Sequence, residues 1–312
     1  MHFCRLNDLP PAPVGKSGWP WTEESSAIPD FSLDGGAWPK ISIVTPNFNQ
    51  GQFIEETIRS VLLQNYPNIE YIVMDGGSSD DSVAIIKKYE SWLACWVSES
   101  DSGQYDAINK GFGRSSGLIM MWINSDDMLV RNSLGVIATI FLSFKNQVQW
   151  LTGIPAYWDI NNNLYQILSP MNYQRRLISL GCYHQKALGW IMQECTCWTR
   201  NLWDLSGGSL DSSLNYAADF ELWCRFGRYA DLYSISTILG ANRQRYGQKT
   251  ELAFEYYREI DQVVRRKILC LMANKLFLIS PVRKLARLYF IAKKNKFSIY
   301  YESRKLSWKV NS

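Results

Sequence analysis

Two neighbouring carboxylates, Asp126 and Asp127, follow soon after an apolar run at residues 118–123. A short uninterrupted apolar run is typical of a strand buried on both faces, and such a strand excludes charges unless they are paired or metal-bound. We therefore expect both acids at the carboxyl end of this strand, where open α/β sheets bind ligands. Hard oxygen anions there favour Mg²⁺ or Mn²⁺ that also contacts a phosphate. Taken alone, however, the pair is more simply explained as a solvated turn or a helix N-cap.

Three earlier apolar segments also end in polar loops, and each is followed by a helical pattern. Together with the first run, they predict strands at residues 41–45, 69–74, 93–97 and 118–123. Strands that alternate with helices predict βαβ units on a mainly parallel sheet, and right-handed crossovers bring the strand ends to one edge. Asp75, Asp101 and Asp126 would then converge. Three acids at three strand ends favour a shared site over unrelated turns.

The second half of the chain predicts shorter elements. A hairpin is expected around residues 161–163, a strand at 191–199, and a helix at 216–226 with Asp219 in its first turn, where the helix dipole favours a carboxylate. A late strand and further helices are predicted at residues 231–238, from 246 onward and from 281 onward. Residues 1–40 are rich in Pro and Gly and predict an extended segment.

Composition limits the cellular setting. The seven cysteines are odd in number and lack paired CxxC spacing, which argues against a disulfide framework or a zinc site. The N-terminus does not resemble a signal peptide, and no window reaches the roughly 18 apolar residues of a spanning helix. We therefore expect a cytoplasmic protein, or one held peripherally on the inner face of the membrane. Most of the 13 tryptophans are expected to fill the core.

Positive charge is concentrated at the C-terminal end. Residues 265–312 hold thirteen of the 33 Lys and Arg residues but a single acid, Glu302. This asymmetry predicts either a solvated helical face packed on the body or a basic amphipathic segment that contacts anionic lipid. Nucleic acid is not an expected partner, because no recognised nucleic-acid-binding motif is present.

Six motifs occur in an order that resembles family 2 glycosyltransferases, which are inverting, sugar-nucleotide-dependent enzymes with the GT-A fold. The resemblance covers roughly residues 41–250 and implies an α/β fold: a mainly parallel central sheet flanked by helices, with a helical C-terminal extension. The motifs are Val-Thr-Pro-Asn-Phe-Asn at 44–49, Ser-Val-Leu-Leu-Gln at 60–64, Val-Met-Asp-Gly-Gly-Ser-Ser-Asp at 73–80, Glu-Ser-Asp-Ser-Gly at 99–103, Asp-Ala-Ile-Asn-Lys-Gly at 106–111 and Asn-Ser-Asp-Asp at 124–127.

The resemblance implies roles for individual residues. Phe48 would face the base, Asp75 would bond to the base or ribose, and Asp101 and Lys110 would line the nucleotide and its phosphates. Asn124 stands where the DxD motif of the family has its first acid, which leaves Asp126 and Asp127 as the ligands of Mg²⁺ or Mn²⁺ and of the ribose, with the division of these roles between them open. The implied nucleotide-sugar-binding residues are Thr45, Pro46, Phe48, Asn49, Asp75, Asp101, Lys110, Asn124, Ser125 and Asp126.

The acceptor side carries a second set. The acid of the family's Asp-Tyr/Phe-x-Leu-Trp motif is the expected general base, and it is Asp219 here, with Glu221 as the alternative. Trp223 and Arg243 are weaker acceptor-side candidates. Position 245, where the family loop often carries His, is Arg. The Gln-x-x-Arg-Trp motif of processive members is absent, which favours transfer of one sugar per visit.

The resulting hypothesis is an inverting, hexosyltransferase-like enzyme. It would use a nucleotide-diphosphate sugar, with UDP favoured, and a glycan or lipid-linked glycan acceptor in cell-surface polysaccharide or glycolipid synthesis. Its GT-A domain would span 41–260, with a nucleotide-binding half at 41–127, an acceptor half at 128–260 and a basic helical extension at 261–312. The alternatives are a sugar-nucleotide nucleotidyltransferase, which would need a Gly-rich first loop, and a non-catalytic nucleotide- or glycan-binding protein.

Overall fold

The computed structural model describes residues 4–32, 35–169, 171–248, 253–265, 268–292, 296–303 and 307–311. The N-terminal half of the chain alternates strands and helices as predicted. After a short 3-10 turn (η1, Leu6–Asp8), its elements are β1 Ile41–Asn47, α1 Ile54–Leu62, β2 Ile69–Asp75, α2 Ser82–Lys88, η2 Glu90–Trp92, β3 Cys95–Ser98, α3 Gln104–Gly113, β4 Ile119–Trp122, β5 Met128–Leu129 and α4 Ser133–Ser143.

The C-terminal half is more mixed. Its elements are β6 Trp150–Thr152, β7 Ala156–Trp158, β8 Leu164–Ile167, α5 Arg175–Ser179, η3 Gln193–Cys195, β9 Thr196–Thr199, α6 Arg200–Leu205, α7 Ala218–Phe226, β10 Leu232–Ile235, β11 Gly240–Arg243, α8 Ala253–Arg265, α9 Ile268–Leu278, α10 Ser280–Ala292, β12 Ser298–Glu302 and β13 Ser307–Val310.

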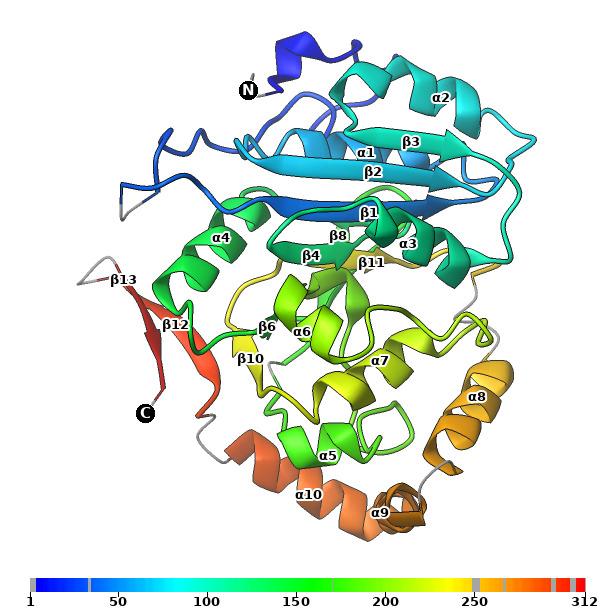
Figure 1. The fold of residues 1–312 in the computed structure, drawn as a ribbon, viewed down its shortest axis with the longest axis vertical. Helices are drawn as coiled ribbons and strands as arrows, with labels where there is room; N and C mark the ends of the chain where they lie inside the picture. Colours follow the sequence, from blue (N-terminus) through cyan, green and yellow to red (C-terminus); the bar gives the residue numbers. More distant parts are fainter. Residues whose placement is uncertain are drawn as a thin grey trace.

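A nine-stranded sheet in the order β13-β12-β10-β6-β9-β4-β1-β2-β3 crosses the molecule (Figure 1). β1 pairs in parallel with both β2 and β4, and β2 pairs in parallel with β3. β9 runs antiparallel to its neighbours β4 and β6. The predicted mainly parallel sheet is therefore confirmed. A smaller sheet, in the order β5-β11-β7-β8, carries the predicted hairpin around residues 161–163.

The strand order reverses direction at β1, because β2 and β3 extend the sheet on one side and β4 extends it on the other. At such a switch point the connecting helices leave toward opposite faces and a crevice opens beyond the carboxyl ends of the strands. The strand carrying Asn124 to Asp127 at its end is thus next to the strand that ends at Asn47. The topology alone places the ligand crevice between these two loops.

Both faces of the large sheet are buried, and successive residues of a strand serve opposite cores. Ile43 and Met121 pack in the core that contains α1 and α4, whereas Val44 and Trp122 pack in the core that contains α3 and α7. The second core holds an aromatic cluster in which Trp122 stacks on Trp223, with an angle of 8° between the ring planes. Trp150 and Trp198 complete this cluster, so the expectation of core tryptophans is met at all four positions.

Two predicted elements differ from the structure in extent. The strand expected at 191–199 starts only at Thr196, because a 3-10 turn precedes it. The C-terminal extension does contain helices, but it ends in the hairpin β12–β13, and β12 lies parallel to β10 at the sheet edge. Ile299 of β12 is fully buried. This burial joins the end of the chain to the main body. Local helical patterns in the sequence cannot reveal such a contact. The proposed domain limits stay a prediction.

Glu56 of α1 is the buried acid to which distant segments of the chain attach. It pairs with Arg243 of β11 at 2.7 Å and with Lys16 at 3.0 Å, and it accepts hydrogen bonds from Asn162 and Trp21. Both Glu56 and Arg243 are almost wholly buried. One carboxylate thereby connects the N-terminal segment, the β7–β8 hairpin and the strand that borders the crevice.

We expect Glu56→Gln to lower the free energy of unfolding by about 3–5 kcal/mol, because it leaves the buried Arg243 guanidinium without a compensating charge. Chemical denaturation followed by tryptophan fluorescence measures the change. Glu23→Gln is the matched control, since Glu23 pairs with Arg131 at the surface, where ion pairs are worth about 0–1 kcal/mol. Equal effects of the two substitutions would contradict the role of Glu56 as a connecting acid.

Candidate active site

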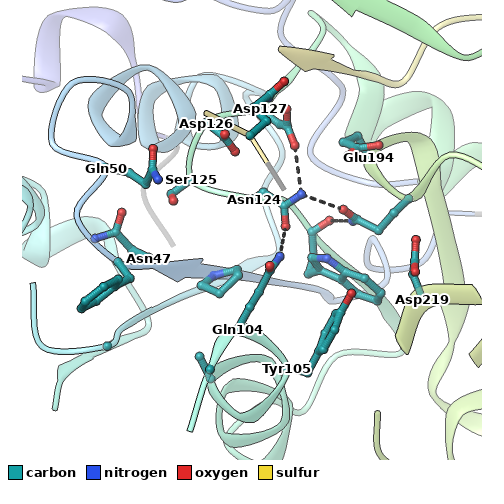
Figure 2. Close-up of a pocket in the computed structure, with 18 of the residues that line it drawn as sticks. Asn47, Gln50, Gln104, Tyr105, Asn124, Ser125, Asp126, Asp127, Glu194 and Asp219 are labelled. Atoms are coloured by element: carbon teal, nitrogen blue, oxygen red, sulfur yellow. Dashed lines mark hydrogen bonds between the residues drawn. The ribbon is translucent and has the colours of Figure 1, made fainter. Parts of the chain in front are cut away.

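A cavity of about 640 Å³ opens where the topology predicts the crevice. Its walls come from the loops after β1 and β4, the start of α3, the start of α7 and the loop after β11 (Figure 2). Gly103, at φ 112°, provides the turn into α3, a backbone conformation that L side chains rarely adopt. Eight residues predicted from the sequence line it: Pro46, Phe48, Asp101, Asn124, Ser125, Asp126, Asp127 and Asp219.

Asn124 is the centre of a hydrogen-bonded network on the cavity wall (Figure 2). Its carbonyl oxygen accepts from Gln104 at 2.7 Å, and its amide nitrogen donates to Asp127 at 3.0 Å and to Gln193 at 3.3 Å. Gln193 in turn donates to the carbonyl oxygen of Trp122. The amide of Asn124 can accept a hydrogen bond from a neutral donor and also donate one to a carboxylate. An acid at position 124 would instead repel the neighbouring carboxylate of Asp127.

Asp127 is a buried carboxyl beside a second one, Glu194. Both residues line the cavity, but Asp127 is fully buried, and its oxygens accept hydrogen bonds from the backbone N–H of Arg243 at 2.8 Å and from Asn124. Burial, together with the neighbouring charges of Glu194 and Asp126, raises the pKa of Asp127 well above its ordinary value. Burial also raises the pKa of Glu194.

Asp126, unlike Asp127, pairs with a cation, the guanidinium of Arg245. The carboxylate oxygen Oδ2 of Asp126 lies 2.8 Å from Nη2 and 3.0 Å from Nε of Arg245. Its backbone carbonyl accepts from Nε of Arg243. The two neighbouring acids therefore have different environments: Asp126 is paired with a cation at the cavity, whereas Asp127 is a structural acceptor inside the wall.

Asp219 stands at the far end of the cavity from Asn47 (Figure 2). It lies in the first turn of α7, half-buried, and one of its oxygens accepts from the backbone N–H of Phe220 at 2.7 Å. Burial is the main reason that its pKa rises to about 7, with the charge of Glu194 adding to it. A carboxyl whose pKa is near neutrality is suited to accept a proton at physiological pH.

A second cavity of about 360 Å³ adjoins the first. The two share wall residues, among them Glu194, Tyr216 and Asp219. The remainder of the second cavity is rich in aromatic rings, contributed by Tyr157, Trp190, Tyr256 and Tyr257. Asp219 thus lies on the boundary between a polar cavity and an aromatic one.

Comparison with known proteins agrees with this geometry. The model of glycosyl transferase family 2 matches residues 42–198, which include all but the first residue of β1, all but the last residue of β9 and the acid-bearing strand ends between them. The chain belongs to glycosyl transferase family 2. The resemblance stated from the six motifs is thereby confirmed, and the chain is a glycosyltransferase.

Relatives and solved structures support the same assignment. An uncharacterized glycosyltransferase of Rickettsia prowazekii is 26% identical over 226 residues, 72% of this chain and 70% of that protein. The Escherichia coli UDP-Glc:alpha-D-GlcNAc-diphosphoundecaprenol beta-1,3-glucosyltransferase WfgD is 32% identical over 124 residues, 39% of this chain and 47% of that protein. The structure of S. aureus TarS 1-349 in complex with UDP-GlcNAc has a TM-score of 0.58 at 18% identity and covers 72% of this chain and 65% of that one. The last match supports the GT-A fold.

Asp75 of this glycosyltransferase lies behind the wall that contains Asn47 and does not itself line the cavity. It is buried and accepts hydrogen bonds from Asn47 at 2.6 Å, from Ser98 at 2.6 Å and from Ser78 at 2.5 Å. Burial would raise the pKa of Asp75, but the bonds from Ser78, Ser98 and Asn47 outweigh it and hold the pKa below its ordinary value. Asn47 does line the cavity, so Asp75 acts on that wall by orienting Asn47.

Three other donor-side predictions also fall outside the walls of the cavity. Thr45 is fully buried and bonds to the hydroxyl of Tyr71. Asn49 is exposed and its side chain accepts from the backbone N–H of Ser79. Lys110 pairs with Asp106 at 3.1 Å and with Glu99 at 3.6 Å on the outer side of α3. These residues build or flank the loops of the glycosyltransferase but do not face its cavity.

The weaker acceptor-side candidates need correction, because the structure gives each of them another partner. Glu221, the alternative base, binds Arg225 one helical turn away at 2.8 Å. Trp223 is in the aromatic core, stacked on Trp122. Arg243 is buried in its pair with Glu56. Glu221 lies two positions after Asp219, about 200° around the helix α7, so of these two acids only Asp219 faces the cavity.

Several wall residues were not singled out from the sequence. Gln104 and Tyr105 begin α3, and Gln193 and Glu194 precede β9. Gln193 and Glu194 fall within the strand expected at 191–199, and nothing in their spacing indicates a partner. Arg245 was noted only for departing from His. Arg245 reaches Asp126, which is 119 residues earlier in the chain, because β11 pairs with β5. The other missed wall residues with side-chain amides are Asn47, Gln50, Asn242 and Gln248.

The residues present fit a divalent ion only in part. Within the described ranges, no group of three or more His, Cys, Asp or Glu side chains could hold a metal ion. Mg²⁺ in proteins often uses one or two carboxylates and takes its remaining ligands from substrate phosphates and water. Asp126 at the cavity is compatible with such a substrate-completed site. Both oxygens of Asp127 already accept hydrogen bonds from the protein, which argues against a direct role for Asp127.

Proposed function

We propose that this glycosyltransferase moves one sugar from a UDP-sugar to a hydroxyl of a glycan or lipid-linked glycan, with inversion at the anomeric carbon. The observation that carries the proposal is the position of Asp219 on the boundary of two cavities. A base that deprotonates an acceptor must lie between donor and acceptor. The polar cavity is the proposed donor site, and the aromatic cavity, whose rings suit sugar faces, is the proposed acceptor site.

The choice of UDP rests on two supports. TarS has been solved with UDP-GlcNAc, and WfgD is named as a glucosyltransferase that uses UDP-Glc. In this chain, the donor-side wall presents Asn47, which Asp75 holds in place, and the exposed ring of Phe48. The ring would stack on the base, and the amide would bond to its polar edge. The positive end of α3 begins at Gln104 on the same wall and would face the diphosphate.

The proposed chemistry is one in-line displacement. The acceptor oxygen forms a bond to the anomeric carbon on the face opposite to the leaving group, the bond from that carbon to the diphosphate breaks, and the acceptor proton passes to Asp219. A Mg²⁺ or Mn²⁺ ion bound by Asp126 would supply Lewis-acid stabilisation of the leaving diphosphate. Asn124 donates hydrogen bonds to Asp127 and Gln193 and so holds both side chains in place behind this site.

A panel of UDP-, dTDP- and GDP-sugars tests the proposal. With Mn²⁺ present, UDP-sugars should raise the melting temperature most, because a ligand that binds only the folded state stabilises it. They should also be hydrolysed slowly in the absence of acceptor. Release of pyrophosphate from a nucleoside triphosphate and a sugar phosphate would favour a nucleotidyltransferase instead. Binding without hydrolysis or transfer to any glycan would favour a non-catalytic protein.

We further propose that the α9–α10 region docks on anionic lipid. Met272, Leu276, Leu285 and Leu288 are each at least half exposed, and Lys275, Arg283, Lys284 and Arg287 are interleaved with them in the sequence. Apolar side chains flanked by basic ones favour the interface of an anionic membrane. None of the helices among the described residues has the length and apolarity to cross a membrane. A lipid-linked acceptor would suit a surface contact of this kind.

The double substitution Lys275→Ala/Lys284→Ala should weaken co-sedimentation with phosphatidylserine-containing vesicles about 30-fold, since each basic residue near such a surface is worth about 1 kcal/mol. The matched control is Lys87→Ala/Lys88→Ala, at the exposed end of α2 on the opposite side of the molecule (Figure 1). An equal loss of vesicle binding in the two double variants would mean that the attraction is nonspecific, and it would contradict docking through α9–α10.

A further inference from the structure

Arg245 is anchored at the proposed diphosphate site by contacts that leave it at the cavity wall. Nη2 of its guanidinium lies 2.8 Å from Oδ2 of Asp126 and donates to Oε1 of Gln50 at 3.0 Å. The guanidinium carbon lies 5.0 Å from the centre of the Phe53 ring. The side chain is 14% exposed. The guanidinium of Arg245 is paired with a carboxylate and stacked on a ring, yet it still lies at the surface of the cavity. It is therefore positioned to exchange one anionic partner for another.

Two other cations that the sequence analysis singled out, Arg243 and Lys110, have partners elsewhere. Arg243 is buried against Glu56, and Lys110 lies outside with Asp106 and Glu99. Among the described residues that line the cavity, Arg245 is the only Lys or Arg. The same stretch of wall contributes carboxyl groups from Asp126 and Asp127. A diphosphate that enters this cavity therefore meets one positive side chain in the described part of the wall, and that side chain is already bound to the proposed metal ligand.

We propose that Arg245 and a divalent ion are alternative partners of Asp126, and that Arg245 binds the donor diphosphate once the ion has taken its place. This inference rests on the proposed function. Without donor, the guanidinium occupies Oδ2 of Asp126 and opposes binding of the ion alone. With donor, Asp126 would be the protein ligand of the ion, and the guanidinium of Arg245, freed from Asp126, would turn to the phosphate oxygens, whose geometry suits its planar donors.

Two binding constants should therefore respond to Arg245→Gln in opposite directions. Binding of Mn²⁺ alone, measured by electron paramagnetic resonance of free Mn²⁺, should become about tenfold tighter, because a competing cation has been removed from Asp126. Binding of UDP in the presence of EDTA, measured by calorimetry, should become about tenfold weaker, because the cation that remains in the metal-free cavity has been lost. One factor of ten corresponds to about 1.4 kcal/mol.

The opposite signs separate the proposal from a merely structural role, since local disorder would weaken both ligands together. Arg131→Gln is the matched control, because Arg131 pairs with Glu23 on the surface and does not line the cavity. If Arg245→Gln does not fold, Arg245→Lys, which keeps the charge but loses the fork, should shift both constants in the same directions by a smaller factor. Unchanged or parallel shifts in both constants would overturn the inference.

Failure of the inference and failure of the proposed function give different results. If the wild-type protein binds no UDP with or without Mn²⁺, the donor assignment itself is wrong. If the wild-type protein binds UDP and the Arg245 variants bind UDP and Mn²⁺ as the wild type does, the donor site stands and only the exchange of partners at Asp126 is wrong.

Discussion

Asp219→Asn is expected to lower kcat for sugar transfer about 10³-fold, within the range of 10²–10⁴ for the loss of a general acid or base. Asparagine has the same shape but cannot take the acceptor proton. The donor should still bind with nearly the same affinity, because the residue stands at the far end of the donor cavity from Asn47. Initial rates of transfer and calorimetry with UDP measure the two quantities.

Glu221→Gln is the matched control for this substitution, since Glu221 lies two positions further along α7 and pairs with Arg225 outside the cavities. Its effect on kcat should be less than about threefold. Equal losses of kcat in the two variants would mean that the helix, and not the carboxylate of Asp219, is what matters. A normal kcat for Asp219→Asn would exclude Asp219 as the base.

The pH dependence of the wild-type enzyme follows from the same carboxyl. Its pKa is raised to about 7, and a base must be unprotonated, so kcat/KM should rise about tenfold per pH unit below pH 7 and level off above it. This inflection should vanish from the residual rate of Asp219→Asn. An inflection near pH 4 would show that the carboxyl is solvated in solution and that burial does not shift its pKa.

Folding stability provides an independent check. A carboxyl whose pKa is higher in the folded state binds its proton more tightly there than in the unfolded chain, where the pKa is about 3.9. Its contribution is therefore fully favourable below about pH 4 and is lost as the pH rises to about 7. At pH 8 the melting temperature of Asp219→Asn should equal or exceed that of the wild type. A clear decrease would indicate that loss of activity came from unfolding.

Asp126→Ala should lower kcat/KM by about 10²- to 10³-fold, because a Lewis acid at a leaving phosphate is worth several kcal/mol and this carboxylate is its expected protein ligand. Added Mn²⁺ should no longer tighten the binding of UDP. In EDTA the variant should bind UDP at least as well as the wild type, since Arg245 has lost its partner in the cavity wall.

The matched control for Asp126→Ala is Asp81→Ala, because Asp81 is an exposed acid before α2 whose side chain makes no cap hydrogen bond. Its transfer rate and its response to Mn²⁺ should match the wild type. Undiminished enhancement of UDP binding by Mn²⁺ in Asp126→Ala would contradict the assignment and move the metal site to other residues.

Much of the framework is readable in short windows of sequence. The alternation of apolar runs with helical patterns predicts β1 to β4, because the spacing of buried side chains depends only on the local backbone period. Placing Asp101 and Asp126 at one edge needs only the rule that parallel strands end on the same side. The motif around Asp219 likewise indicated a carboxylate at the start of α7, and the structure has it there.

Partners, in contrast, depend on segments far apart in the chain. Asp75 was expected at the nucleotide, but five donor groups of its own protein surround it, so it orients Asn47. Asp126 and Asp127 are neighbours in sequence yet differ in burial and in partner, because adjacent side chains leave the backbone in different directions. No local pattern distinguishes the carboxylate at the cavity from the one in the wall.

The sequence by itself thus determined the family, the parallel sheet and the acids at the strand ends, since these depend on local periodicity and on ordered motifs. Only the tertiary structure decided that Arg245 pairs with Asp126, that Glu194 joins Asp219 between two cavities, and that β12 joins the sheet through β10. The physical reason is that these contacts arise from the pairing and packing of distant elements. Charge, burial and hydrogen bonding then assign each side chain its role.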